Sequence, residues 1–115
     1  MDESQFDEVA DFVVVGSGGG SMAAALYLKS IGKNPLILEK TDKFGGSTAM
    51  SGGVLWIPNN HIGARDGVVD SYEAARTYMD AAIGFDAGPG SSPERKEAFV
   101  QNGPVMLKWL EDHGM

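Results

Sequence analysis

The sequence predicts an α/β fold, and three features near its N-terminus support that prediction. The apolar, β-branched run at 12–15 is typical of a strand that is buried on both faces. A cluster of glycines follows at 16–20, and a second apolar run at 35–38 ends at the acid Glu39. A strand, a glycine-rich turn, a helix and a second strand in this order predict a βαβ unit with parallel strands over residues 11–40.

The helix of this unit is expected over residues 20–31. Its apolar side chains recur at helical spacing, which gives the helix one face to pack on the sheet. That face comprises Ala24, Leu28 and Ile31. We expect Gly32 to cap the C-terminal end of the helix and Pro35 to open the second strand.

The glycine cluster is similar to a G-x-G-x-x-G phosphate-binding turn, with one departure. Gly16 would make the tight turn, and Gly18 would let the backbone approach a diphosphate without a Cβ in the way. The third glycine position holds Ser21, a small residue that preserves the helix–strand packing at modest cost. The following helix would direct free N–H groups and its positive dipole end at the anion. These features predict a Rossmann-like dinucleotide-binding unit.

Glu39 lies at the end of the second strand, near the ~20-residue offset expected of an acid that binds an adenosine ribose. Its carboxylate would accept hydrogen bonds from the ribose hydroxyls and repel a 2′-phosphate, which disfavours NADP. Two plainer interpretations stay open. The glycines could form a turn in another kind of α/β protein, and Glu39 could be a solvated acid at a strand end.

Residues 41–60 are rich in glycine and serine and end in an apolar run that includes Trp56. In a simple nicotinamide dehydrogenase, a helix and a third parallel strand would usually follow the second strand. This loop can instead offer backbone N–H groups and hydroxyls to a large, flat ligand or to its phosphates. A flexible linker is the alternative interpretation, but linkers seldom carry residues such as Trp56.

The composition narrows the classes of function. A chain of 115 residues with 43% apolar residues suits one modest folded domain. Its formal charge of -7 argues against binding to nucleic acid or to an anionic membrane, and the absence of cysteine excludes disulfides and thiolate metal sites. No metal-ligand cluster or membrane-spanning run is visible, and the acidic leader at 1–10 is unlike a secretory signal. We therefore expect a soluble, cytoplasmic protein.

Residues 71–115 are expected to be mainly helical. Asp70 or Ser71 can cap a first helix, and Ser92 can cap a second one with Pro93 in its first turn. A proline inside a helix removes a backbone donor and displaces a carbonyl of the preceding turn. The dipeptide 103–104, which is Gly-Pro, is therefore expected to break the second helix and start a third.

Three segments carry a resemblance to a known family: DFVVVGSGGG, LILEK and GGSTAMSGGVLWIPNN. Together they resemble the N-terminus of the FAD-dependent fumarate reductase/succinate dehydrogenase flavoprotein superfamily. The third segment is the most restrictive, and it most resembles the 3-ketosteroid dehydrogenases, which introduce a Δ1 double bond into a steroid ring. The resemblance implies FAD as the cofactor, a steroid-like ketone as the substrate, hydride transfer to flavin N5 and an external electron acceptor.

The resemblance also implies a set of residues around the cofactor. Residues of the glycine turn would surround the pyrophosphate, Glu39 would bind the adenosine ribose, and donors of the 46–53 segment would lie beside the flavin. The segment 56–60 would lie near the substrate. The full cofactor-binding set is Gly16, Ser17, Gly18, Gly19, Gly20, Ser21, Glu39, Lys40, Gly46, Ser47, Thr48, Ser51, Gly52 and Gly53.

No catalytic residue is assigned in this chain. Members of the resembled family abstract a proton with a tyrosinate, but their catalytic tyrosines match no position here. Tyr72 and Tyr78 lie in an expected helix, where packing or surface roles are favoured, and His61 is a weaker candidate that follows the 58–60 loop. We expect the catalytic residues to lie beyond Met115.

Two good strands are visible in the sequence, whereas a doubly wound sheet needs several. The resemblance implies several hundred residues, so the chain is predicted to be the N-terminal part of an incomplete FAD-binding domain, with exposed strand edges and apolar surface. Its predicted parts are an acidic leader at 1–10, the βαβ unit at 11–40, a flavin-side loop at 41–60 and helices at 71–115. Two other functions stay open. One is a flavin reductase acting on a small unsaturated acid, and the other is a nucleotide-binding fragment without catalysis.

Overall fold

The computed structural model describes residues 6–115, so the first half of the acidic leader lies outside the described residues. The chain divides into two compact units, Met1–Val54 and Leu55–Met115. The first unit contains both strands that the structure describes, and the second unit is helical.

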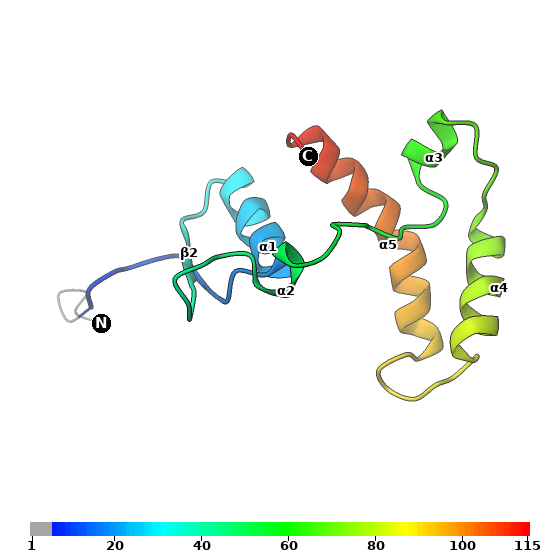
Figure 1. The fold of residues 1–115 in the computed structure, drawn as a ribbon, viewed down its shortest axis with the longest axis horizontal. Helices are drawn as coiled ribbons and strands as arrows, with labels where there is room; N and C mark the ends of the chain where they lie inside the picture. Colours follow the sequence, from blue (N-terminus) through cyan, green and yellow to red (C-terminus); the bar gives the residue numbers. More distant parts are fainter. Residues whose placement is uncertain (1–5) are drawn as a thin grey trace. The chain divides into compact units, whose positions relative to one another are not determined.

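A parallel pair of strands, the helix that connects them and a short later helix, α2 (Gly46–Ala49), make up the regular structure of the first unit (Figure 1). Strand β1 is Phe12–Val15, helix α1 is Gly19–Ser30 and strand β2 is Pro35–Leu38. The register pairs Phe12 with Pro35 and Val15 with Leu38. The α/β class and the parallel pairing are therefore confirmed, and α1 begins one residue earlier than expected.

Strand β1 is more exposed than its apolar sequence predicts. Val14 is buried, but Val15 is 80% exposed and Phe12 is 54% exposed. The expectation of burial on both faces is therefore wrong for this chain. In the described residues β1 pairs only with β2, so much of its apolar surface has no cover. The expected exposure of apolar surface is confirmed.

The buried position of α1 also differs from the expected one. Ala25 is buried, whereas Ala24 and Ile31 are exposed and Leu28 is half-buried. The first turns of α1 carry small or apolar residues on nearly every side. The spacing of apolar residues therefore did not identify which side packs.

Three helices make up the second unit: α3 is His61–Arg65, α4 is Tyr72–Ile83 and α5 is Pro93–Asp112. The two longer helices begin at the predicted serine caps. Ser71 Oγ accepts a hydrogen bond from the Ala74 amide at 3.1 Å, and Ser92 Oγ accepts one from the Arg95 amide at 3.4 Å. These caps satisfy amides that have no partner inside their helix.

Helix α5 continues through Pro104, so the predicted break at 103–104 is wrong. The helix changes direction near its middle instead of ending there (Figure 1). Gly103 is buried, and a Cβ added to it would lie 3.1 Å from Ile57 Cγ2. Leu107, on the far side of the proline, is also buried. Packing on both sides of Pro104 holds the chain helical where proline alone would favour a break.

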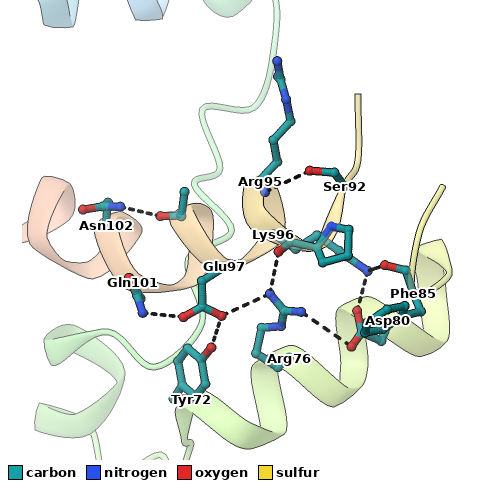
Figure 2. A network of polar contacts seen from close by, with 12 residues as sticks. Tyr72, Arg76, Asp80, Phe85, Ser92, Arg95, Lys96, Glu97, Gln101 and Asn102 are labelled. Carbon is teal, nitrogen blue, oxygen red and sulfur yellow. Dashed lines mark hydrogen bonds and ion pairs between the residues drawn. The ribbon is translucent and has the colours of Figure 1, made fainter. Parts of the chain in front are cut away.

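Helices α4 and α5 pack through a small apolar core and a polar network. The core contains Ala75, Met79 and Val100, with Tyr72 packed against it. Lys96 is only 2% exposed, and its ammonium group contacts the Asp80 carboxylate (Figure 2). It also donates to the carbonyl oxygens of Gly84 at 2.5 Å and Phe85 at 2.7 Å.

Glu97 forms the other half of this network (Figure 2). It accepts hydrogen bonds from the hydroxyl of Tyr72 and from Arg76 Nη1, the latter at 3.3 Å. The hydrogen bond to Glu97 raises the pKa of Tyr72, because ionisation would place two anions in contact. These contacts agree with a packing role for Tyr72, while Tyr78 is 60% exposed.

Among residues 6–115, no helix combines the length and apolarity that a bilayer crossing needs.

The apolar core of α4 and α5 should dominate the stability of the second unit. Changing Met79 to Ala should lower the free energy of unfolding by about 2–5 kcal/mol, because it leaves a cavity beside Val100. Urea unfolding followed by circular dichroism measures this. The matched control is Met106→Ala, at a position that is 40% exposed, which should change stability by about 0.5 kcal/mol or less. Equal losses in the two variants would contradict the assignment of the core.

Candidate functional site

The end of β1 and the start of α1 enclose the glycine turn. The Gly16 amide donates to the Leu38 carbonyl at 2.7 Å, which extends the strand pairing by one step. Gly16 then adopts a φ of 87°, a left-handed conformation that favours glycine. The chain can therefore leave the sheet at once and enter α1 three residues later.

The N-terminus of α1 is open on one side. A Cβ added at Gly16, Gly18 or Gly20 would meet nothing within 4 Å, and the N-cap Gly18 supplies no side-chain acceptor. By helix geometry, the amides of Gly20 and Ser21 have no partner inside α1. The turn therefore presents backbone donors and the positive end of the helix to open space, which is the arrangement that binds phosphate groups.

Glu39 lies directly after β2 and reaches the glycine turn. Its Oε2 atom accepts hydrogen bonds from both the amide and the hydroxyl of Ser17, the amide at 3.0 Å. Its Oε1 atom accepts from the Thr41 amide at 3.0 Å. These hydrogen bonds, that of the Ser17 hydroxyl above all, lower the pKa of Glu39 to about 2 from 4.5. The carboxylate, which is ionised at neutral pH in any case, therefore stays ionised well into the acid range.

Two contacts connect the glycine turn to the segment that follows Glu39. The Gly45 amide donates to Ser17 Oγ at 2.8 Å, and the Gly19 amide donates to Thr48 Oγ1 at 3.0 Å. A Cβ added to Gly46 would lie 3.3 Å from Gly18 Cα, so the two backbones approach closely. Part of the expected loop is in fact a short helix, α2, at Gly46–Ala49.

The structure brings together only part of the predicted cofactor-binding set. The residues whose contacts meet at the turn are Ser17, Gly18, Gly19, Glu39, Gly46 and Thr48, flanked by Gly16, Gly20 and Ser21. Lys40 and Ser47 are exposed neighbours in sequence. The last three predicted residues, Ser51, Gly52 and Gly53, follow α2, where the Ser51 hydroxyl donates to the Thr48 carbonyl at 2.9 Å.

Sequence reasoning missed Thr41 and Gly45, which contact Glu39 and Ser17 respectively. The sequence signal for Gly45 is the glycine pair that it forms with Gly46, and in the structure Gly45 adopts a φ of 112° at the start of α2. Thr41 carried no such signal, and only the structure shows its contact with Glu39.

The second unit holds a separate cleft of about 560 Å³, lined in part by Asn59, Asn60, His61 and Trp109. His61 Nε2 lies 2.7 Å from Glu111 Oε2, and Arg65 donates to the same carboxylate at 3.1 Å. Hydrogen bonds from His61 and Arg65 hold the pKa of Glu111 below its usual value. Because the Nε2 atom of His61 already has the Glu111 carboxylate as its partner, the contact agrees with a structural role for His61.

Trp56 lies elsewhere in the second unit, in a cluster of aromatic rings. Its ring stacks on Phe99 with centroids 6.0 Å apart and meets Tyr78 at 5.6 Å. Residues 56–60, which are expected beside a substrate, therefore lie in two places. Trp56 belongs to this cluster, whereas Asn59 and Asn60 line the cleft. Their place beside a substrate stays a prediction.

The residues of the first unit fit the ADP half of FAD. The open space beside the glycines suits a pyrophosphate, since backbone amides face it and a side chain would narrow it. An ionised carboxylate at the end of the neighbouring strand suits a ribose, whose hydroxyls are hydrogen-bond donors.

Curated proteins resemble this chain along most of its length. A 3-oxosteroid 1-dehydrogenase of Mycobacterium tuberculosis is 46% identical over 103 residues, which are 90% of this chain and 18% of that protein. A urocanate reductase of Eggerthella lenta is 51% identical over 104 residues, which are 90% of this chain and 16% of that protein. The chain thus spans less than a fifth of the length of these relatives.

Two solved structures share its fold. A 3-ketosteroid Δ1-dehydrogenase of Sterolibacterium denitrificans, in complex with 1,4-androstadiene-3,17-dione, matches with a TM-score of 0.76 and 38% identity over 90% of this chain and 17% of its own. A 3-ketosteroid Δ4-(5α)-dehydrogenase of Rhodococcus jostii RHA1, in complex with 4-androstene-3,17-dione, matches with a TM-score of 0.81 and 32% identity over 98% of this chain and 23% of its own.

The family comparison agrees with this geometry. Residues 11–115 match the family described as FAD binding domain, so the match covers the glycine turn, Glu39 and all of the described helices. FAD is accordingly the cofactor that the chemistry of the first unit and the match both indicate. The chain belongs to the FAD binding domain family.

Proposed function

We propose that this chain supplies the ADP-binding part of an FAD-dependent dehydrogenase that acts on a 3-ketosteroid-like substrate. The observation that carries the proposal is the ionised Glu39 carboxylate beside an open glycine turn. In this proposal residues 1–115 are the N-terminal part of a longer FAD-binding domain, with the Rossmann-like unit at 11–40, the flavin-side segment at 41–60 and helices at 71–115.

Each part of the first unit has a role in the proposal. The amides of Gly20 and Ser21 bind the pyrophosphate, with Gly16 and Gly18 keeping the approach clear of side chains. Glu39 accepts a hydrogen bond from the adenosine ribose. The remaining members of the predicted set, Gly19, Ser17, Lys40, Gly46, Ser47, Thr48, Ser51, Gly52 and Gly53, shape the turn or line the path toward the flavin.

The steroid substrate is proposed from the relatives. Three lines agree: the oxosteroid dehydrogenase at 46% identity and the two ketosteroid dehydrogenase structures with TM-scores of 0.76 and 0.81. Bound FAD would supply the redox chemistry by accepting a hydride at its N5 atom. This chain's residues would hold the cofactor's ADP end while an external acceptor takes up the electrons. The catalytic residues are proposed to lie outside these 115 residues.

A second candidate is a flavin reductase that acts on a small unsaturated acid, because the urocanate reductase is 51% identical over 90% of this chain.

An activity assay on the protein expressed from its complete reading frame distinguishes these two functions. A dehydrogenase should reduce an artificial electron-accepting dye when supplied with 4-androstene-3,17-dione. A reductase should instead oxidise a reduced dye when supplied with urocanate. Activity with urocanate alone would overturn the steroid assignment.

Changing Glu39 to Gln should weaken FAD binding roughly tenfold to a hundredfold, because the amide replaces a charged acceptor with a group that is half donor. Flavin fluorescence quenching during titration of the flavin-free protein measures the affinity. The matched control is Asp42→Asn, which removes the same charge from an exposed position in the next turn. An unchanged FAD affinity in Glu39→Gln would remove the ribose role.

Glu39 should also make folding stability dependent on acid pH. Its folded-state pKa, about 2, lies below the ordinary 4.5, so its contribution is fully present above pH 4.5 and is lost as the pH falls toward 2. Urea unfolding at several pH values should show a steeper loss of stability in this range for the unsubstituted protein than for Glu39→Gln. Parallel pH profiles would show that the carboxylate is not held as described.

A further inference from the structure

Ser17 is only 2% exposed and makes three hydrogen bonds, although it is a small residue between two glycines. Its amide and its hydroxyl both donate to Oε2 of Glu39. Its hydroxyl oxygen also accepts from the Gly45 amide at 2.8 Å. A single side chain therefore contacts the end of β2 and the beginning of the segment that leads to α2.

The two carboxylate oxygens of Glu39 are used differently. Oε2 accepts two hydrogen bonds, and both come from Ser17. Oε1 accepts from the Thr41 amide at 3.0 Å and lies 3.3 Å from the Thr41 hydroxyl. That hydroxyl has one proton and lies closer, at 2.7 Å, to the Lys43 carbonyl, which is its better acceptor. Oε1 thus keeps a lone pair for a further donor, whereas Oε2 is saturated.

We propose that Ser17 is a positioning residue, which holds Oε2 of Glu39 so that Oε1 faces the adenosine ribose. This inference rests on the proposed function, because it concerns how the same carboxylate meets its ligand. The ribose then binds to one oxygen of a fixed carboxylate and need not displace the hydrogen bonds from Ser17. Through Gly45, the same hydroxyl also sets where the flavin-side segment begins relative to that carboxylate.

A purely structural role for Ser17 makes a different prediction from a positioning role. Loss of a structural contact would weaken every ligand of the turn alike, or would only lower stability. Loss of positioning would remove the part of the affinity that comes from the ribose hydroxyls. Comparing ADP with 2′,3′-dideoxy-ADP, which lacks those hydroxyls, isolates that part as a ratio of two dissociation constants.

The experiment uses the flavin-free protein and calorimetric titration with the two nucleotides. The unsubstituted protein should bind ADP about tenfold more tightly than the dideoxy analogue, as expected for a hydrogen bond to a charged acceptor. In Ser17→Ala the ratio should fall to about two or three, because the Ser17 amide alone then holds Oε2 and the carboxylate turns more freely. The control Ser30→Ala removes an exposed hydroxyl that bonds to the Tyr27 carbonyl at the other end of α1, and it should keep the full ratio.

Each outcome decides one question. A full ratio in Ser17→Ala would overturn the positioning role and leave the proposed function intact. A ratio of about one in the unsubstituted protein, or no binding of ADP to it, would overturn the role of Glu39 in the proposed function itself. If Ser17→Ala fails to fold, Ser17→Cys repeats the comparison with a side chain of similar size whose thiol is a weak donor. That variant should also lose most of the ratio, and a full ratio would again overturn the inference.

Discussion

The hydrogen bonds between Ser17 and Glu39 are the interaction on which the rest of the first unit depends. They join the residues that follow two parallel strands, so they close the end of the sheet from which the chain departs. The same contacts lower the pKa of the carboxylate and place the glycine turn against it. The first unit has few buried apolar side chains. A fully satisfied polar contact at this position therefore fixes a single conformation, as a larger core would otherwise do.

The second unit depends on a different polar contact inside an apolar surrounding. Lys96 is buried where α4 and α5 meet, with the Asp80 carboxylate and two loop carbonyls around its ammonium group. Removal of either partner would leave a buried charge or unsatisfied carbonyls, so the pair constrains the 84–92 connection as well as the two helices. The apolar core of Ala75, Met79 and Val100 packs the same two helices together.

Much of the fold could be predicted from local sequence because its signals are local. The βαβ order follows from apolar runs and glycines, and the caps at Ser71 and Ser92 follow from side-chain chemistry alone. The break at Pro104 was wrongly predicted because tertiary packing of Gly103 and Leu107 overrides the preference of proline. The contact between Ser17 and Glu39 joins residues 22 positions apart and has no periodic signal, so only the structure revealed it.

Relatives with different reactions resemble this chain to a similar degree, and the geometry explains why. An oxosteroid dehydrogenase and a urocanate reductase match this chain at 46% and 51% identity, although one name denotes an oxidation of its substrate and the other a reduction. The groups that converge on the glycine turn are backbone amides, two hydroxyls and one carboxylate. Such groups suit the ADP end of a cofactor, which is the same whichever substrate reacts at the flavin. We therefore expect this part of the sequence to reflect cofactor binding. Substrate specificity should depend on the residues that contact the flavin ring.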